Sequence, residues 1–158
     1  MSPQKLFAAF SEEEQEEYAR RAEQMYDPET VRESNRKWKS YSAEKKQAIE
    51  VCLDEVGRQV PVVAGTVGYN TEHSIELSKQ AAKLGVHGVL SLCPFYNRPS
   101  QAGIEAHFRA IAQASPLPVL LYDIPVRTGR KVDPEVLVRL AHEVSNIVGV
   151  KDASGNPG

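Results

Sequence analysis

From about residue 42 onward, the apolar residues of the chain follow two alternating patterns. Four short, continuous apolar runs cover residues 61–66, 86–93, 118–122 and 147–150. Such runs are typical of strands that are covered on both faces. Between them, apolar residues recur every three or four positions, which predicts helices. Two of these helices cover 43–56 and 101–114. A third begins at the cap residue Thr71 and ends at Gly85, and a fourth begins at the cap residue Asp133.

The alternation of strand and helix predicts an α/β fold with a parallel sheet. Parallel neighbours need a crossover, which is usually a helix, and such crossovers are right-handed. We therefore expect four parallel strands with helices packed on them. A complete (β/α)8 barrel takes roughly 200 residues at the least. The 158 residues of this chain are too few for a complete barrel, so we expect a partial one.

The first 41 residues differ from the rest. They are rich in charged residues and carry almost no β-branched apolar side chains. Ser11 and Glu14 form a capping-box pattern, and Asp27 followed by Pro28 is a second helix start. We expect a charged helical segment over 1–41, without strands, and an α/β domain over 42–158.

Composition and charge exclude several classes of function. The chain has 19 Lys and Arg against 21 Asp and Glu, which gives no basic face for nucleic acid. No run of 18 apolar residues exists, so we expect no membrane span. Cys52 and Cys93 stand in apolar surroundings and predict buried, reduced thiols in a cytoplasmic protein. The four histidines lack metal-ligand spacing, so no metal is expected.

Candidate catalytic residues follow the predicted strands, where parallel α/β folds place their active sites. Lys151 comes directly after the run 147–150. In a dry pocket its neutral amine would be favoured, because burial disfavours the ammonium form. A neutral amine can attack a ketone and form a Schiff base. The alternative is a lysine at a strand end that extends to water.

Three further residues share this position and the same ambiguity. Tyr122 ends the third run, where its hydroxyl could relay a proton or simply belong to the core. Tyr96 lies in a proline-flanked loop and suits either a site or a subunit contact. Arg127 stands in a turn, where it could bind a carboxylate or remain solvated.

Four motifs, at 60–66, 94–101, 121–129 and 148–155, resemble those of the dihydrodipicolinate synthase family. The last three read Pro-Phe-Tyr-Asn-Arg-Pro-Ser-Gln, Leu-Tyr-Asp-Ile-Pro-Val-Arg-Thr-Gly and Val-Gly-Val-Lys-Asp-Ala-Ser-Gly. This family belongs to the pyruvate-dependent class I aldolases, whose fold is a (β/α)8 barrel. The resemblance implies a cytoplasmic lyase of lysine biosynthesis that condenses pyruvate with aspartate semialdehyde. It also implies a covalent Schiff base in place of a cofactor.

The resemblance assigns a role to each candidate. Lys151 is similar to the lysine that forms the Schiff base, and Tyr122 to the tyrosine that shuttles protons. Tyr96 is similar to a loop tyrosine that reaches the site of a neighbouring subunit, which implies a homo-oligomer. Arg127 is similar to the arginine that binds the carboxylate of the aldehyde.

The chain also departs from the family pattern. It matches only the third to sixth barrel strands, and no Gly-Thr-Thr-Gly-Glu motif precedes residue 60. That motif supplies the relay threonine and the pyruvate carboxylate site in the family. Residues 10–41 instead faintly resemble the thiostrepton-binding effector domain of MerR-type regulators. An alternative function is therefore a non-catalytic chimera of regulator helices and half a barrel.

Overall fold

The computed structural model of the protein describes Arg20 and residues 41–155. Contacts within the chain divide it into two units, Met1–Trp38 and Lys39–Gly158, and the fold described here is that of the second. The expected helical segment over 1–41 lies outside the described residues, apart from Arg20, which is helical, and Tyr41.

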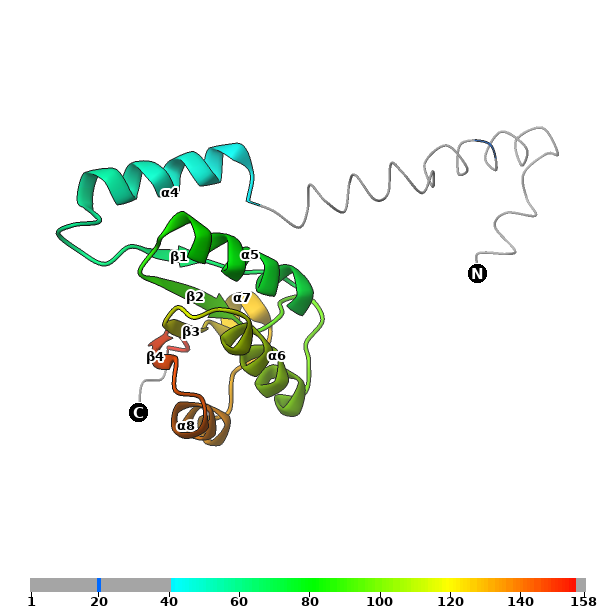
Figure 1. Ribbon diagram of the computed structural model, residues 1–158. Helices are drawn as coiled ribbons and strands as arrows, with labels where there is room; N and C mark the ends of the chain where they lie inside the picture. The colour runs from blue at the N-terminus through cyan, green and yellow to red at the C-terminus, as the bar shows by residue number, and fades with distance from the viewer. Residues whose placement is uncertain (1–19, 21–40, 156–158) are drawn as a thin grey trace. The chain divides into compact units, whose positions relative to one another are not determined.

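The second unit alternates helices and strands along its length (Figure 1). Its elements are α4 (Ala43–Val56), β1 (Val63–Gly65), α5 (Thr71–Leu84), β2 (Gly88–Leu92), α6 (Gln101–Ala114), β3 (Val119–Asp123), α7 (Pro125–Thr128), α8 (Pro134–Glu143) and β4 (Ile147–Asp152). The four strands form one sheet in the order β1-β2-β3-β4, and every neighbouring pair is parallel. The expectation of four parallel strands with helical crossovers is confirmed.

Local capping explains where the helices begin. Ser42 and Ser100 each accept a hydrogen bond from a backbone N–H of the first turn, so α4 and α6 have the predicted bounds. The prediction of Thr71 as a cap is wrong by one residue. Asn70 is the cap, because its side chain accepts hydrogen bonds from two backbone N–H groups of α5. At the other end, Gly85 closes α5 in the left-handed conformation.

The hydrophobic core lies between one face of the sheet and helices α5, α6 and α8. On this helix-covered face, Ala64, Val89 and Leu121 are buried. Ile104, Phe108 and Leu140 contribute the largest buried apolar side chains from the helices. In Figure 1, α5, α6 and α8 follow one another along the sheet. This arrangement leaves the ends of the strands free to carry a site.

Helix α4 contains no buried residue. Ile49 and Leu53 pack partly against the core, whereas Cys52 is exposed. The prediction that both thiols are buried is therefore wrong for Cys52 and right for Cys93. Helix α4 packs on the core only through these partly buried side chains, and Cys52 lies outside that contact.

Tyr41, which precedes α4, is buried in the core of the second unit. Its hydroxyl donates a 2.9 Å hydrogen bond to the carbonyl of Gly65, and its own N–H donates to the side chain of Gln80. Burial raises the pKa of Tyr41 to about 12. Tyr41 thus binds the segment before α4 to β1.

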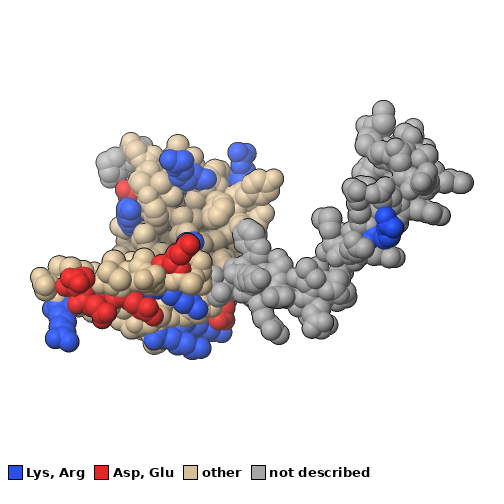
Figure 2. Space-filling view, turned by 90° about the horizontal axis from the view of Figure 1, so that it is seen from above, with Lys and Arg blue, Asp and Glu red and all other residues tan. Residues whose placement is uncertain are grey.

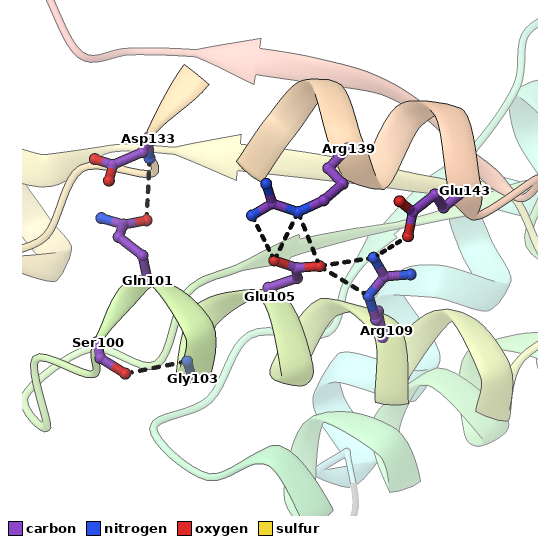
Figure 3. A network of polar contacts seen from close by, with 8 residues as sticks. All are labelled: Ser100, Gln101, Gly103, Glu105, Arg109, Asp133, Arg139 and Glu143. Carbon is purple, nitrogen blue, oxygen red and sulfur yellow. Dashed lines mark hydrogen bonds and ion pairs between the residues drawn. The ribbon is translucent and has the colours of Figure 1, made fainter. Parts of the chain in front are cut away.

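An ion cluster joins the outer surfaces of α6 and α8 (Figure 3). Glu105 accepts from Arg109 on its own helix and from Arg139 on α8, at 2.6 and 2.8 Å. Arg109 also contacts Glu143 at 2.6 Å. Hydrogen bonds from Arg139 and Arg109 lower the pKa of Glu105 to about 2. A second link in Figure 3 runs from the backbone N–H of Asp133 to Gln101.

Charges of both signs share the face shown in Figure 2. Helix α4 carries four exposed acidic residues, namely Glu44, Glu50, Asp54 and Glu55. Within the described part of the chain, no helix is long and apolar enough to cross a membrane.

Candidate active site

Tyr122 and Lys151 lie side by side at the carboxyl ends of β3 and β4. They are Cα partners in the register of the two strands, so their side chains project from the same face. The Lys151 Nζ atom lies 4.2 Å from the centroid of the Tyr122 ring, which is a cation–π contact. The amine and the phenol proposed to act together are thus in direct contact.

Lys151 is exposed, so within the described chain it is a lysine at a strand end that extends to water and not one in a dry pocket. The reason is its place in the sheet. Strand β4 pairs with β3 on one side, and no described strand pairs with its other edge. Val148 and Val150 on the same strand are exposed as well. The lysine is positioned by its strand but not desolvated.

The face of the sheet that carries this pair is the one turned away from the helices. We call it the open face, and it consists of Val63, Leu90, Leu92, Leu120, Tyr122 and Lys151. Its apolar residues are half-buried or exposed. Apart from Lys151 at the rim, the open face carries no charged side chain along β1 to β4.

Two carboxylates occupy the opposite face at the same ends of β3 and β4. Asp123 and Asp152 are Cα partners, one residue beyond the Tyr122–Lys151 pair. Asp123 is only 3% exposed and accepts a hydrogen bond from the N–H of Val132 at 3.2 Å. Burial, and secondarily the charge of Asp152, raises the pKa of Asp123. A hydrogen bond from the Ser154 backbone lowers the pKa of Asp152.

The sequence analysis missed Asp123, although a signal for it exists. Side chains alternate between faces along a strand, so an Asp directly after Tyr122 must point toward the helices. There it binds the segment that follows β3. Its side chain binds Val132, and its carbonyl accepts from Ala153 at 2.8 Å. Asp123 therefore fixes the loop that carries Arg127.

Arg127 stands in α7, a single helical turn at the position where the sequence predicted a turn. Pro125 starts it, and Gly129 ends it at a φ of 70°. The buried Thr128 hydroxyl lies 2.7 Å from the carbonyl of Arg130 and fastens the turn. The Arg127 side chain is exposed, so its guanidinium is available at the end of β3.

Tyr96 projects from the loop after β2 and is 92% exposed. Its φ of 73° and the φ of 45° at Arg98 are left-handed values that cost energy for residues other than glycine. Contacts from neighbouring loops hold this conformation. The Asn97 side chain donates to the carbonyl of Tyr69, and Arg130 donates to the carbonyl of Pro99. Neither Tyr96 nor Arg127 forms a hydrogen bond or ion pair with Tyr122 or Lys151 within the described residues.

Among the described residues, no three His, Cys, Asp or Glu side chains gather closely enough to hold a metal ion. His107 is the most buried histidine of the four, and its partners are Thr71 and a backbone carbonyl.

The model of the dihydrodipicolinate synthetase family matches residues 39–157. The chain belongs to this family. The 4-hydroxy-tetrahydrodipicolinate synthase of Acidothermus cellulolyticus is 51% identical over 113 residues, which cover 72% of this chain and 36% of that protein. The enzyme of the same name from Nostoc sp. is 51% identical over 118 residues, covering 74% of this chain and 40% of that one.

Solved structures of the family have the same fold as the described unit. The dihydrodipicolinate synthase of Thermotoga maritima gives a TM-score of 0.72 at 36% identity, over 73% of this chain and 39% of that chain. The enzyme of Cyanidioschyzon merolae with lysine bound gives 0.69 at 46% identity, over 72% and 39%. These relatives are (β/α)8 barrels, so the expected partial barrel is confirmed. The chain spans between 36 and 40% of the length of the two curated synthases named above.

Proposed function

We propose that this chain carries the Schiff-base chemistry of a 4-hydroxy-tetrahydrodipicolinate synthase, with pyruvate as the first substrate. The observation that carries the proposal is the contact of Lys151 with Tyr122 at the carboxyl ends of adjacent parallel strands. Membership of the family supports the same assignment.

In this proposal the Lys151 amine attacks the ketone carbon of pyruvate to form a carbinolamine, which loses water to give an imine. Loss of a methyl proton then gives an enamine, whose carbon attacks the aldehyde of aspartate semialdehyde. Tyr122 moves protons in these steps, since the amine lies over its ring. Arg127 binds the carboxylate of the aldehyde. The amine itself supplies the covalent catalysis, so the proposal requires no cofactor.

Tyr96 is proposed to act across a subunit contact, because its exposed ring is held at the tip of a strained loop. A homo-oligomer follows from this role. The proposal also places the protein in the cytoplasm, consistent with two free cysteines. It keeps the division into a charged helical segment over 1–41 and an aldolase-like domain over 42–158.

Borohydride trapping tests the assignment of Lys151. Hydride reduces the imine to a stable secondary amine, so intact mass reports one covalently attached pyruvate. We expect slow adduct formation in the wild type and none in Lys151→Ala. Lys83→Ala is the matched control, because Lys83 is an exposed lysine on α5.

Equal mass increases in the wild type and Lys151→Ala would refute the assignment. No adduct in the wild type would favour the alternative, a non-catalytic chimera. Little or no synthase turnover is expected in either case, because the printed sequence contains no Gly-Thr-Thr-Gly-Glu motif before residue 60 to hold the pyruvate carboxylate.

A further inference from the structure

The helix-covered face of the sheet becomes polar toward the carboxyl ends of β1 and β2. Ala64 and Val89 are Cα partners on this face, and both are buried. The same alternation places Thr66 beside Ser91, because the Thr66 N–H still bonds to the carbonyl of Leu90 at 2.9 Å. Both Thr66 and Ser91 are fully buried. Two hydroxyl side chains are therefore neighbours under the helices.

Ser74, a third fully buried hydroxyl residue, reaches the same end of the sheet from α5. It ends the first turn of α5, which follows the carboxyl end of β1 and runs back to the start of β2. Helix α5 packs on β2, and Figure 1 shows it lying along β1 and β2. A Cβ atom added to Gly68 would lie 3.2 Å from the Ser74 Oγ atom, so this hydroxyl faces the loop that follows Thr66. We call Thr66, Ser74 and Ser91 the hydroxyl cluster.

None of the three hydroxyls in this cluster has a hydrogen-bond partner among the described residues. Their oxygen atoms are already closed off from solvent. Contact with any further segment of chain would therefore require α5 to move off the sheet. A buried hydroxyl without a partner costs free energy, and the large majority of such groups in folded proteins are bonded. The partner of the hydroxyl cluster must be small enough to lie inside the fold.

We propose that a water molecule is bound inside the hydroxyl cluster, where it bridges Thr66 and Ser91 to Ser74. Water suits this site because it both donates and accepts, and a buried water typically forms about three hydrogen bonds. The surroundings are polar as well, since the Thr71 hydroxyl lies 2.9 Å from the Nδ1 atom of His107. The water joins the carboxyl ends of β1 and β2 to the start of α5. The proposal goes beyond the function assigned to the site and does not depend on it.

Thr66→Val tests the bond to the water, because it removes one hydroxyl and keeps the branched shape of the side chain. We expect the thermal midpoint of the full chain to fall by a few degrees, since a buried hydrogen bond is lost. Thr128→Val is the matched comparison, because Thr128 is buried and its hydroxyl donates to the carbonyl of Arg130 at 2.7 Å. Its midpoint should fall too. An unchanged or raised midpoint in Thr66→Val alone would overturn the proposal, because removing an unpaired buried hydroxyl does not destabilise the fold.

Magnetic relaxation dispersion of the water oxygen nuclei detects the bound water in solution. A water held inside the protein relaxes at the tumbling rate of the protein, and the exchange of hydroxyl protons does not affect the oxygen signal. We expect a smaller dispersion amplitude in Ser91→Val, whose methyl groups occupy the place of the water, than in the wild type. Thr128→Val should keep the wild-type amplitude, because its hydroxyl bonds to protein carbonyls. Equal amplitudes in the wild type and Ser91→Val would overturn the proposal.

A crystal structure of the wild-type chain provides a readout that needs no substitution. Electron density for an oxygen atom within hydrogen-bond distance of the hydroxyls of Thr66, Ser74 and Ser91 is expected. Direct hydrogen bonds among these hydroxyls, without such density, would overturn the proposal. Neither outcome changes the assignment of Lys151, since borohydride trapping measures that separately.

Discussion

At the scale of single residues, the contact between Lys151 and Tyr122 sets what each can do. The Lys151 Nζ atom lies 4.2 Å from the centroid of the Tyr122 ring. A cation over the face of an aromatic ring is attracted to it. The hydroxyl on the same ring is a candidate for moving protons. These two roles of Tyr122 belong to different atoms, so one substitution can separate them.

Tyr122→Phe removes the hydroxyl and keeps the ring under Lys151. We expect the rate of pyruvate trapping to fall on the order of a hundredfold, which is typical for the loss of one positioned proton-transfer group. The unfolding midpoint should stay close to the wild-type value. Tyr69→Phe is the control, because it removes a phenol hydroxyl from a ring that packs against Phe95. If Tyr122→Phe traps pyruvate as fast as the wild type, the proton-shuttling role is wrong.

The site residues were predictable to different degrees. Lys151 and Tyr122 could be placed together because parallel strands end at one edge, and the register now puts them opposite each other. The exposure of Lys151 could not be foreseen from the apolar run before it. An apolar run indicates a strand, but it does not say whether both faces of that strand are covered. Asp123 does not stand out in the sequence, because alternation along the strand places it on the face opposite Tyr122 and Lys151.

At the scale of elements, helices α5, α6 and α8 are joined to the sheet and to one another by a few polar links. His107 is one of them, and it is only 2% exposed. Its Nε2 lies 3.1 Å from the carbonyl of Leu92, which can only accept, so Nε2 carries the proton. Its Nδ1 then accepts from the Thr71 hydroxyl at 2.9 Å. This neutral ring connects α6, β2 and the start of α5.

The His107 link predicts a loss of stability in acid. Burial lowers the pKa of His107 from 6.5 to about 4, and the bond to Leu92 opposes this only partly. Between these pH values the unfolded chain binds a proton that the folded chain does not. The free energy of unfolding should therefore fall by about 3 kcal/mol as pH drops from 6.5 through 4.

Urea unfolding at pH 7 and pH 4.5 measures this effect in the wild type, His107→Gln and His142→Gln. His142 is exposed on α8 and serves as the control. The decrease should be largest in the wild type and the control, and smaller in His107→Gln. Equal decreases in all three proteins would show that His107 does not contribute.

The ion cluster around Glu105 gives a second prediction for elements. Glu105→Gln keeps the shape of the side chain and weakens its bonds to Arg109 and Arg139. We expect the thermal midpoint to fall by a few degrees at low salt and by less in high salt, because salt screens exposed pairs. Glu50→Gln on α4 is the control, because Glu50 is exposed, and it should not change the midpoint. A salt-independent decrease would point to lost packing rather than lost charge.

Helix bounds were the most predictable part of the fold, because they depend on neighbouring residues. Ser42 and Ser100 cap α4 and α6 where the sequence indicates. The single turn α7 is too short to show the spacing of apolar residues that indicates a helix. Its only sequence signals are Pro125 at its start and Gly129 at its end. Burial was less predictable, as Cys52 shows, because it depends on what lies across from an element. That information is not local.

At the scale of the whole molecule, the described unit has a complete core on one side of its sheet and an incomplete one on the other. The helix-covered face buries Val89, Leu121 and the large side chains of α6. The open face carries Lys151 at its rim, where water reaches the amine. An exposed ammonium is stabilised by water, and covering it favours the neutral, nucleophilic form. The chemistry of Lys151 should therefore respond to whatever covers the open face.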